Sequence, residues 1–208
     1  MINITLAILA KNEAHCIADA ILSAKPFVNE IMVVNDHSTD DTEAICTMVG
    51  ARMVTPPFKV SDVGFSVAWN WMLDNASHDW VLIMDADERL GPDAYALQNL
   101  TRFPDKEVWN LPRRKWTSFP KSRMEYEAYP DWQTRFMKRN PEHRFTGELH
   151  VTYRCPRIHN AYRGPHIEHL QEEFRTPDKM KQRTDTYTKL ASQQGVAIVG
   201  GDVLRTTA

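Results

Sequence analysis

Closely spaced carboxylates follow an apolar run in the first half of the chain. The run spans residues 80–84, and Asp85, Asp87 and Glu88 come directly after it. A short, wholly apolar segment is typical of a strand buried in a parallel sheet, and ligands bind beyond the carboxyl ends of such strands. Alternate strand residues point the same way, so Asp85 and Asp87 can converge on one ion while Ala86 stays clear. Such oxygen ligands suit Mg²⁺ or Mn²⁺ bound with substrate phosphates.

Two further polar segments follow predicted strands. They are Ala10, Lys11, Asn12 and Glu13 after the first strand, and residues 34–42 after the second. Within the second segment, a carboxylate at Asp36 can accept a hydrogen bond from a nucleobase or a ribose. Each segment also has a simpler interpretation. Asp87 or Glu88 could start a helix, and residues 36–41 could be a turn with a helix cap.

The elements that must position these residues alternate between strand and helix. Strands are predicted at residues 4–9, 31–34, 52–54 and 80–84, and helices at residues 13–24, from a Ser38 cap to Gly50, and at 65–73. This order predicts an α/β fold with a mostly parallel sheet flanked by helices, whose strand ends meet at one edge. Residues 104–165 are rich in proline, aromatic and basic residues, which predicts mixed strands and long loops on the same sheet. A polar helix is predicted at residues 177–193.

The composition excludes several classes of protein. The chain has 208 residues, of which 42% are hydrophobic and 25% charged, and its formal net charge is −2. These values predict one domain with a sizeable core and no nucleic-acid partner. The cysteines are three in number and far apart, which predicts free thiols. With no secretory signal pattern and no apolar run of bilayer length, a cytoplasmic protein is expected.

Several motifs carry a resemblance to a known family. The segments at residues 8–13, 35–42 and 79–88 together resemble the nucleotide-binding half of a family 2 glycosyltransferase, which has the GT-A fold. Residues 129–136, 145–150 and 167–169 are similar to the bacterial branch typified by the lipopolysaccharide-core glucosyltransferases. The resemblance implies a single GT-A domain over residues 1–208. Its parts are a nucleotide-sugar-binding half at 1–92, a short mixed acceptor-side half at 93–190 and a tail at 191–208.

The resemblance also implies roles for individual residues. Asp36 would hold the nucleobase, and the implied nucleotide-binding residues are Ala10, Lys11, Asn12, Glu13, Asp36, Ser38, Asn70, Asp85 and Ala86. The implied metal ligands are Asp85, Asp87 and His169, and the histidine favours Mn²⁺ over Mg²⁺. Asp131 is the predicted base for the acceptor hydroxyl, with Glu148 and His150 as rivals. A turn residue beside an aromatic pair is the alternative for Asp131.

The implied activity is a metal-dependent, inverting transfer of a sugar. The expected donor is a nucleoside-diphosphate sugar, with a UDP-hexose as the first choice, and the expected acceptor is a hydroxyl of a saccharide or glycolipid. The alternatives are a nucleotidyltransferase and a non-catalytic nucleotide-sugar-binding protein. A nucleotidyltransferase normally has a glycine-rich loop after the first strand, and residues 10–13 contain no glycine.

Two features need separate interpretation. The basic residues Arg113, Arg114, Lys115, Lys121 and Arg123 form a cluster. A solvated loop is the expected explanation for them. An electrostatic hold on a membrane-borne acceptor is the alternative, with peripheral contact at the inner face of the membrane. Trp69 departs from the family pattern, because relatives often carry Lys or Arg at its position.

Overall fold

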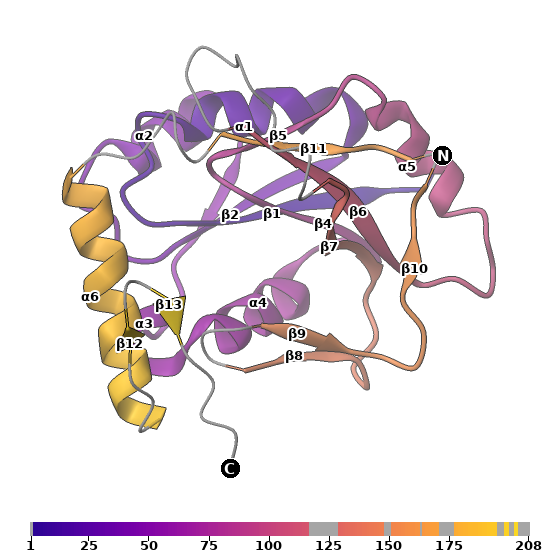
Figure 1. Ribbon diagram of the computed structural model, residues 1–208. Coiled ribbons are helices and arrows are strands. Elements are labelled where there is room, and N and C mark those ends of the chain that lie inside the picture. The colour runs from indigo at the N-terminus through magenta and orange to yellow at the C-terminus, as the bar shows by residue number, and fades with distance from the viewer. Residues whose placement is uncertain are drawn as a thin grey trace.

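A curled sheet with helices on both sides forms the centre of the protein (Figure 1). The computed structural model describes residues 2–116, 129–147, 151–162, 164–170, 177–194, 198–199 and 202–203. None of the helices within these ranges is long and apolar enough to cross a membrane.

The first half of the chain builds the parallel part of the sheet. Its strands lie in the order β3 (Arg52–Val54), β2 (Glu30–Asn35), β1 (Ile4–Ala10) and β4 (Trp80–Asp85), with parallel pairing throughout. The helices between them are α1 (Ile17–Ala24), η1 (Lys25–Phe27), α2 (Thr42–Met48), α3 (Val60–Val63) and α4 (Phe65–Asn75). The central strands are nearly continuous apolar runs, as strands covered on both faces require.

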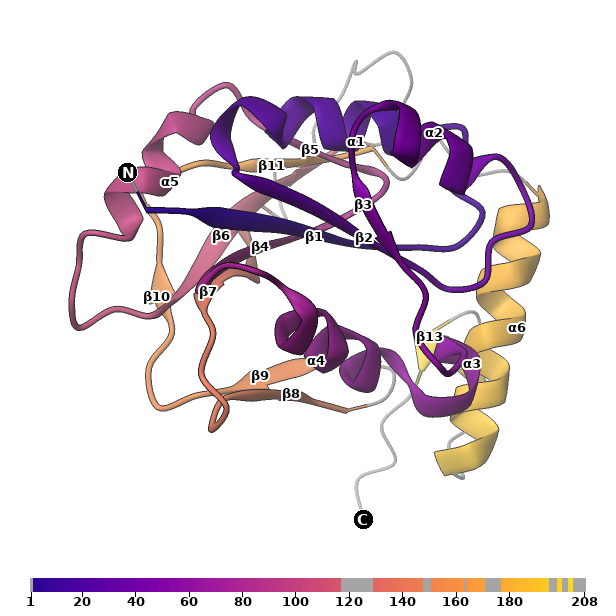
Figure 2. The same cartoon turned by 180° about the vertical axis from the view of Figure 1, so that it is seen from behind.

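Two hydrophobic clusters cover the two faces of this sheet. One joins strand residues such as Leu6 and Ile8 to Ile21 of α1. The other joins the alternate strand residues, such as Ala7, to Met72 of α4. Figures 1 and 2 show the result, with α1 and α2 on one side of the sheet and α4 on the other. The alternation along each strand therefore divides the core into two layers.

The second half extends the same sheet with mixed pairing. β7 (Asp131–Lys138) is antiparallel to β4, β6 (Val108–Lys115) is antiparallel to β7, and β11 (Ile167–His169) is parallel to β6. β5 (Glu88–Leu90) closes the curl by pairing antiparallel with β11, and β10 (His159–Asn160) pairs with β6. The remaining elements are η2 (Ala94–Ala96), α5 (Leu97–Leu100), β8 (Arg144–Thr146), β9 (Thr152–Arg154), β12 (Ile198–Val199) and β13 (Asp202–Val203). These pairings confirm the predicted α/β fold.

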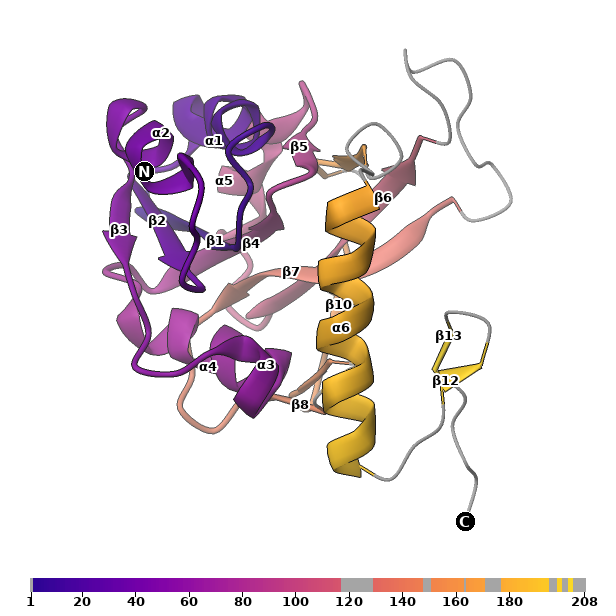
Figure 3. The ribbon, with the colours of Figure 1, turned by 90° about the vertical axis from the view of Figure 1, so that its left-hand side faces the viewer.

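The long helix α6 (Pro177–Gln194) stands beside α3 at one side of the molecule (Figure 3). Leu190 and Ala191 are its buried contact, and they pack against Phe65 at the start of α4. The Lys189 amine lies 2.5 Å from the carboxylate of Asp62 on α3. The helix confirms the polar helix predicted at residues 177–193.

Two of the predicted helix starts are wrong. α1 begins at Ile17 instead of residue 13, and residues 14–16 form a turn before it, in which the N–H of Cys16 donates to the Glu13 carbonyl at 3.1 Å. The N–H of Glu13 donates to the Thr42 hydroxyl at 2.7 Å, which ties this segment to the loop after β2. α2 begins at Thr42, with Asp41 and not Ser38 as its N-cap. The Ser38 hydroxyl instead accepts a hydrogen bond from the N–H of Asn12 at 2.9 Å. For Ser38, a contact between the two loops takes the hydroxyl that would have capped the helix.

Candidate active site

The polar loops that follow β1 and β2 lie side by side at the carboxyl ends of these strands. The N–H of Asp36 donates to the carbonyl of Ala10 at 2.8 Å, so the pairing of the two strands continues into the loops. Asp36 is buried, and its Oδ1 accepts a hydrogen bond from the N–H of Val60 at 3.0 Å. Its Oδ2 lies 3.2 Å from the amine of Lys11, which is the more exposed partner. The loops thus hold this carboxylate in one orientation.

Hydrogen bonds between backbone and neutral side chains join the same two loops. The Asn12 side-chain oxygen accepts from the N–H of Thr39 at 2.7 Å, in addition to the Asn12 contact with Ser38. Asn12 has a positive φ of 54°, a conformation that asparagine adopts more readily than most residues. The structure therefore brings Ala10, Lys11, Asn12, Glu13, Asp36 and Ser38 together, as the sequence predicts.

At the end of β4, the Asp85 carboxylate faces Arg135 of β7. The Arg135 Nη2 lies 2.5 Å from Asp85 Oδ2 and 3.0 Å from Glu88 Oε1, and Arg135 is 2% exposed and Glu88 0%. Burial opposes the charged form of Asp85, but Arg135 outweighs it and holds the pKa of that carboxyl below its usual range. Burial raises the pKa of Glu88 despite the same arginine. The central carbon of the Arg135 guanidinium lies 5.1 Å from the centre of the Trp69 ring, in cation–π geometry.

Arg113 of β6 extends these contacts to Asp131. Its Nη1 lies 3.1 Å from Glu88 Oε1, and its Nη2 lies 2.7 Å from Asp131 Oδ2. Lys115 approaches the same Oδ2 at 3.5 Å, and Gln133 donates to Oδ1 at 2.7 Å. We refer to the five residues Asp85, Glu88, Arg113, Asp131 and Arg135 as the charge cluster.

The pairing of Asp131 bears on its predicted role as a base. Burial works against its charged form, but Arg113 outweighs this and lowers the pKa of Asp131. A lower pKa keeps the carboxylate ionised and makes it a weaker proton acceptor. The role of Asp131 as the base stays a prediction. The rival bases, Glu148 and His150, lie outside the described residues.

The basic residues near position 113 do not form a solvated loop, so that expectation is wrong. Arg113, Arg114 and Lys115 belong to β6, and Arg113 is mostly buried within the charge cluster. Carboxylates supplied by β5 and β7 make this burial possible, and the sequence alone does not pair them with β6. Lys121 and Arg123 lie outside the described residues.

Beyond β4, Asp87 meets His169 at the end of β11. The Oδ2 of Asp87 lies 3.4 Å from the Nε2 of His169, and the Asp87 carbonyl accepts from the N–H of Leu170 at 3.0 Å. The pairing of His169 with Glu88 between β11 and β5 brings the two side chains together. Neither Asp87 nor Glu88 starts a helix, because Glu88 begins β5.

The spacing of Asp87 and His169 fits two ligands of one divalent ion. Ligands at about 2.1 Å from an ion and at right angles lie about 3 Å apart. Asp85, the third predicted ligand, is held by Arg135, and its share in the same ion stays a prediction. Within the described ranges, the one group of three Asp, Glu, His or Cys ligand atoms within 4.8 Å of one another is Glu13, His15 and Cys16. Burial, reinforced by Glu13, raises the pKa of the Cys16 thiol, which disfavours the thiolate.

Asn70 occupies a different part of the structure from the loops after β1 and β2. Its amide donates to the carbonyl of Phe145 at 2.9 Å and accepts from the N–H of the same residue at 2.8 Å. These bonds join α4 to β8. A nucleotide contact by Asn70 stays a prediction.

Sequence reasoning missed Arg135 and the buried role of Glu88. The signal for Arg135 was present, because it is a charged residue directly before Phe136 and Met137, which are both buried apolar residues. A charge in such a strand needs a buried partner, since an unpaired one is very costly. Its partner became evident only from the pairing of β7 with β4.

The chain matches the family model described as Glycosyl transferase family 2 over residues 5–161. It therefore belongs to glycosyltransferase family 2, and its α/β sheet is that of the GT-A fold.

Individual relatives align with only part of the chain. An uncharacterized glycosyltransferase of Rickettsia felis is 39% identical over 93 residues, which cover 45% of this chain and 31% of the relative. The prophage-derived glycosyltransferase SunS of Bacillus subtilis is 34% identical over 86 residues, which cover 40% of this chain and 20% of SunS. The aligned region thus spans less than a third of either relative.

Two solved structures show a partial likeness. Glucosyl-3-phosphoglycerate synthase from Mycobacterium tuberculosis, solved with Mn²⁺ and UDP-glucose, is 25% identical with a TM-score of 0.44. The match covers 54% of this chain and 44% of the synthase. S. aureus TarS is 19% identical with a TM-score of 0.47, over 56% of this chain and 22% of TarS.

Proposed function

We propose that the protein transfers a sugar from a nucleoside-diphosphate sugar, with a UDP-hexose as donor, to a hydroxyl of a saccharide or glycolipid. Membership of glycosyltransferase family 2 supports glycosyl transfer as the reaction. The observation that carries the proposal is the meeting of Asp87 and His169 at the same edge of the sheet as Asp36 and Lys11. Open α/β sheets bind their ligands at this edge.

Asp87 and His169 would hold a divalent ion on the donor diphosphate. A carboxylate oxygen and an imidazole nitrogen 3.4 Å apart are donors that Mn²⁺ accepts, and Mg²⁺ is the alternative. A bound ion of this kind would supply positive charge to the departing nucleoside diphosphate. The position of His169 is supported by its own carbonyl, which accepts from the N–H of Trp116 at 3.1 Å.

Asp36 would recognise the nucleobase. Because the N–H of Val60 already occupies its Oδ1, a base N–H would donate to Oδ2. Lys11 would then leave Oδ2, and its amine would turn toward the diphosphate. An arrangement of this kind couples recognition of the base to neutralisation of the phosphate charge.

The proposed transfer inverts the anomeric carbon. The acceptor hydroxyl loses its proton as its oxygen bonds to that carbon, and the bond from the carbon to the diphosphate oxygen breaks. Asp131 is the proposed base, because it begins β7, which runs antiparallel to β4, and its carboxylate therefore lies at the carboxyl edge of the sheet. Its contacts with Arg113 and Lys115 reduce its basicity, so a pH–rate profile of Asp131→Asn is the direct measurement of this role.

A thermal-shift panel tests the donor site without any acceptor. UDP, GDP, CDP and dTDP are each added with and without Mn²⁺ to the wild type, Asp87→Ala and Asp36→Asn. We expect UDP to stabilise the wild type only with Mn²⁺, by about 2.7 kcal/mol at a concentration of 100 Kd. Asp87→Ala should lose the Mn²⁺ dependence, and Asp36→Asn should lose the preference among bases. No shift with any nucleotide in a folded sample would overturn the proposal.

One observation favours a second candidate function. Arg135 holds Asp85, so of the three predicted metal ligands Asp87 and His169 lie at the spacing of two ligands of one ion. A site of two ligands suits a protein that binds a nucleotide sugar without transferring it. Mn²⁺-dependent UDP binding with neither donor hydrolysis nor transfer would support this candidate over the first.

A further inference from the structure

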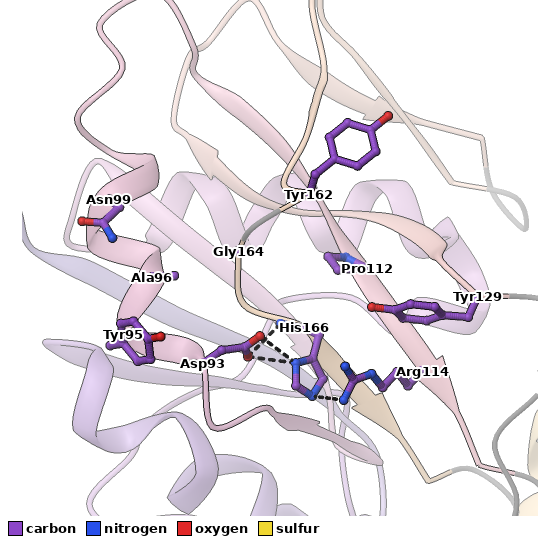
Figure 4. A pocket seen from close by; sticks show the side chains of 10 residues that line it. All are labelled: Asp93, Tyr95, Ala96, Asn99, Pro112, Arg114, Tyr129, Tyr162, Gly164 and His166. Carbon is purple, nitrogen blue, oxygen red and sulfur yellow. Dashed lines mark hydrogen bonds and ion pairs between the residues drawn. The ribbon is translucent and has the colours of Figure 1, made fainter. Parts of the chain in front are cut away.

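A cavity lined by tyrosines and charged side chains opens beside β6 and β11 (Figure 4). Its volume is about 510 Å³, within the range of about 300–1,000 Å³ that is usual for small-molecule sites. The lining residues that matter here are Asp93, Tyr95, Arg114, Tyr129, Tyr162 and His166. None of them belongs to the candidate active site.

The cavity lies on the opposite face of β6 and β11 from the candidate active site. On β6, Arg113 reaches the charge cluster, whereas the next residue, Arg114, reaches His166 at the cavity wall. At β11, His169 contacts Asp87, whereas His166, just before the strand, faces the cavity. Successive residues of a strand point to opposite faces, so the two sites share strands and stand back to back.

The polar wall of the cavity is held in place by His166. The Asp93 carboxylate lies 2.8 Å from His166 Nδ1, and the Nη1 of Arg114 lies 2.9 Å from Nε2. The Glu168 carboxylate lies 3.7 Å from the same Nε2, and Glu168 and Asp93 together raise the pKa of His166 against its burial. The ring also lies against Gly91, where a Cβ would come within 2.4 Å of it. The wall therefore presents a fixed carboxylate and a fixed guanidinium to the cavity.

The aromatic wall is unusually exposed. Tyr95 is 68% exposed and Tyr162 80%, and together with Tyr129 they are the exposed tyrosines of the described ranges. Trp132 of β7 adds an edge-to-face contact to Tyr162, with ring centres 5.1 Å apart. Aromatic rings that carry a hydroxyl combine an apolar face with a polar end, and their gathering at one cavity indicates a ligand with both characters.

A saccharide combines these properties. Its C–H faces stack on aromatic rings, and its hydroxyls both donate to a carboxylate such as Asp93 and accept from a guanidinium such as Arg114. A simple anion fits less well, because Asp93 places a negative charge in the same wall.

We propose that this cavity is a second saccharide-binding site, which holds one or two units of an oligosaccharide on the face opposite the candidate active site. The class of ligand follows from the side chains of the cavity itself. This site would also retain the acceptor chain during the reaction, and only this second role rests on the proposed function.

Saturation-transfer NMR of the whole chain tests the proposal. The probes are glucose, galactose and N-acetylglucosamine oligosaccharides of two to four units, without nucleotide. We expect saturation transfer from the wild type to the oligosaccharides of at least one of these sugars. The effect should be equal in Asp87→Ala, which retains the cavity. The double variant Tyr95→Ala/Tyr162→Ala should bind about four- to hundredfold more weakly, since each of the two aromatic contacts contributes about a two- to tenfold effect. Met48→Ala, which removes an exposed side chain of α2, is the matched control and should bind normally.

Three results would overturn the proposal. The first is the absence of a saturation-transfer signal for every saccharide with a folded wild type. The second is saccharide binding that the double tyrosine variant leaves unchanged. The third is binding of inorganic phosphate, lost in Arg114→Ala, in place of any sugar. The UDP thermal shift is a separate readout, so its failure together with intact saccharide binding would reject the donor site and leave the cavity assignment standing.

Discussion

The two ends of the candidate active site are held by different kinds of interaction. The loops after β1 and β2 are joined mostly by hydrogen bonds of side chains to backbone, such as those of Asn12 and Ser38, beside one part-exposed ion pair between Lys11 and Asp36. The junction of β4 with β7 is held by buried charges, chiefly Arg135 with Asp85 and Glu88. A neutral hydrogen bond contributes about 1 kcal/mol, whereas breaking a buried ion pair costs about 3–5 kcal/mol. The first region thus depends on many small contributions and the second on a few large ones.

The largest effect is expected at the metal end of the site. Asp87→Ala should reduce metal-dependent donor turnover by about 10³-fold, because it removes a ligand that would help to neutralise the diphosphate. The measurement is UDP release from a donor sugar with Mn²⁺. Asp79→Ala, which changes an exposed carboxylate before β4, is the control and should leave turnover unchanged. Normal turnover in a folded Asp87→Ala protein would exclude the metal assignment.

The charge cluster should show the largest effect on stability. Arg135→Met removes the cation of Asp85 and leaves Glu88 with Arg113 alone, so the free energy of unfolding should fall by about 3–5 kcal/mol in urea titrations. Arg144→Met breaks an exposed pair with Asp74 at 2.9 Å and should cost less than about 1 kcal/mol. Equal losses in the two variants would remove the distinction between the regions.

Glu30 combines the two kinds of interaction, because it is a charged side chain that is held mainly by hydrogen bonds. Burial raises its pKa, but donors from Ser77, Thr5 and Arg52 outweigh burial and lower the pKa from 4.5 to about 2. A depressed pKa contributes stability that is present above pH 4.5 and lost as the pH falls through about 2. Glu30→Gln should therefore lower the free energy of unfolding by roughly 2–3 kcal/mol at pH 7, and the difference should shrink between pH 4.5 and 2. A difference independent of pH would contradict this.

The smallest effect is expected in the loops after β1 and β2. Ser38→Ala removes the acceptor of the Asn12 N–H and should cost about 1 kcal/mol in the free energy of unfolding. Ser61→Ala, at a half-buried serine whose hydroxyl donates to the neighbouring Asp62 at 3.2 Å, serves as the comparison. A loss for Ser38→Ala as large as that for Arg135→Met would show that the loops form one cooperative unit.

Much of the first half of the fold was predictable because its signals are local. The strands at residues 4–9, 31–34, 52–54 and 80–84 were placed within one or two residues, since a buried parallel strand is a short apolar run. The helix starts were less predictable, because the Ser38 hydroxyl accepts from Asn12 across the loops instead of capping a helix, and residues 14–16 form a turn before α1 begins. Local propensity does not record such contacts.

Local sequence signals are enough to predict the parallel half of the sheet and the polar segments at its carboxyl edge, because strand length, hydrophobicity and alternation are properties of neighbouring residues. The partners that these segments meet follow from the folded chain alone. The pairing of β7 with β4 gives Asp85 to Arg135, and the pairing of β11 with β5 gives Asp87 to His169. The same curl of the sheet gathers Tyr95, Tyr129 and Tyr162 from separate segments. These meetings depend on which strands become neighbours, and the burial of the whole core sets that choice.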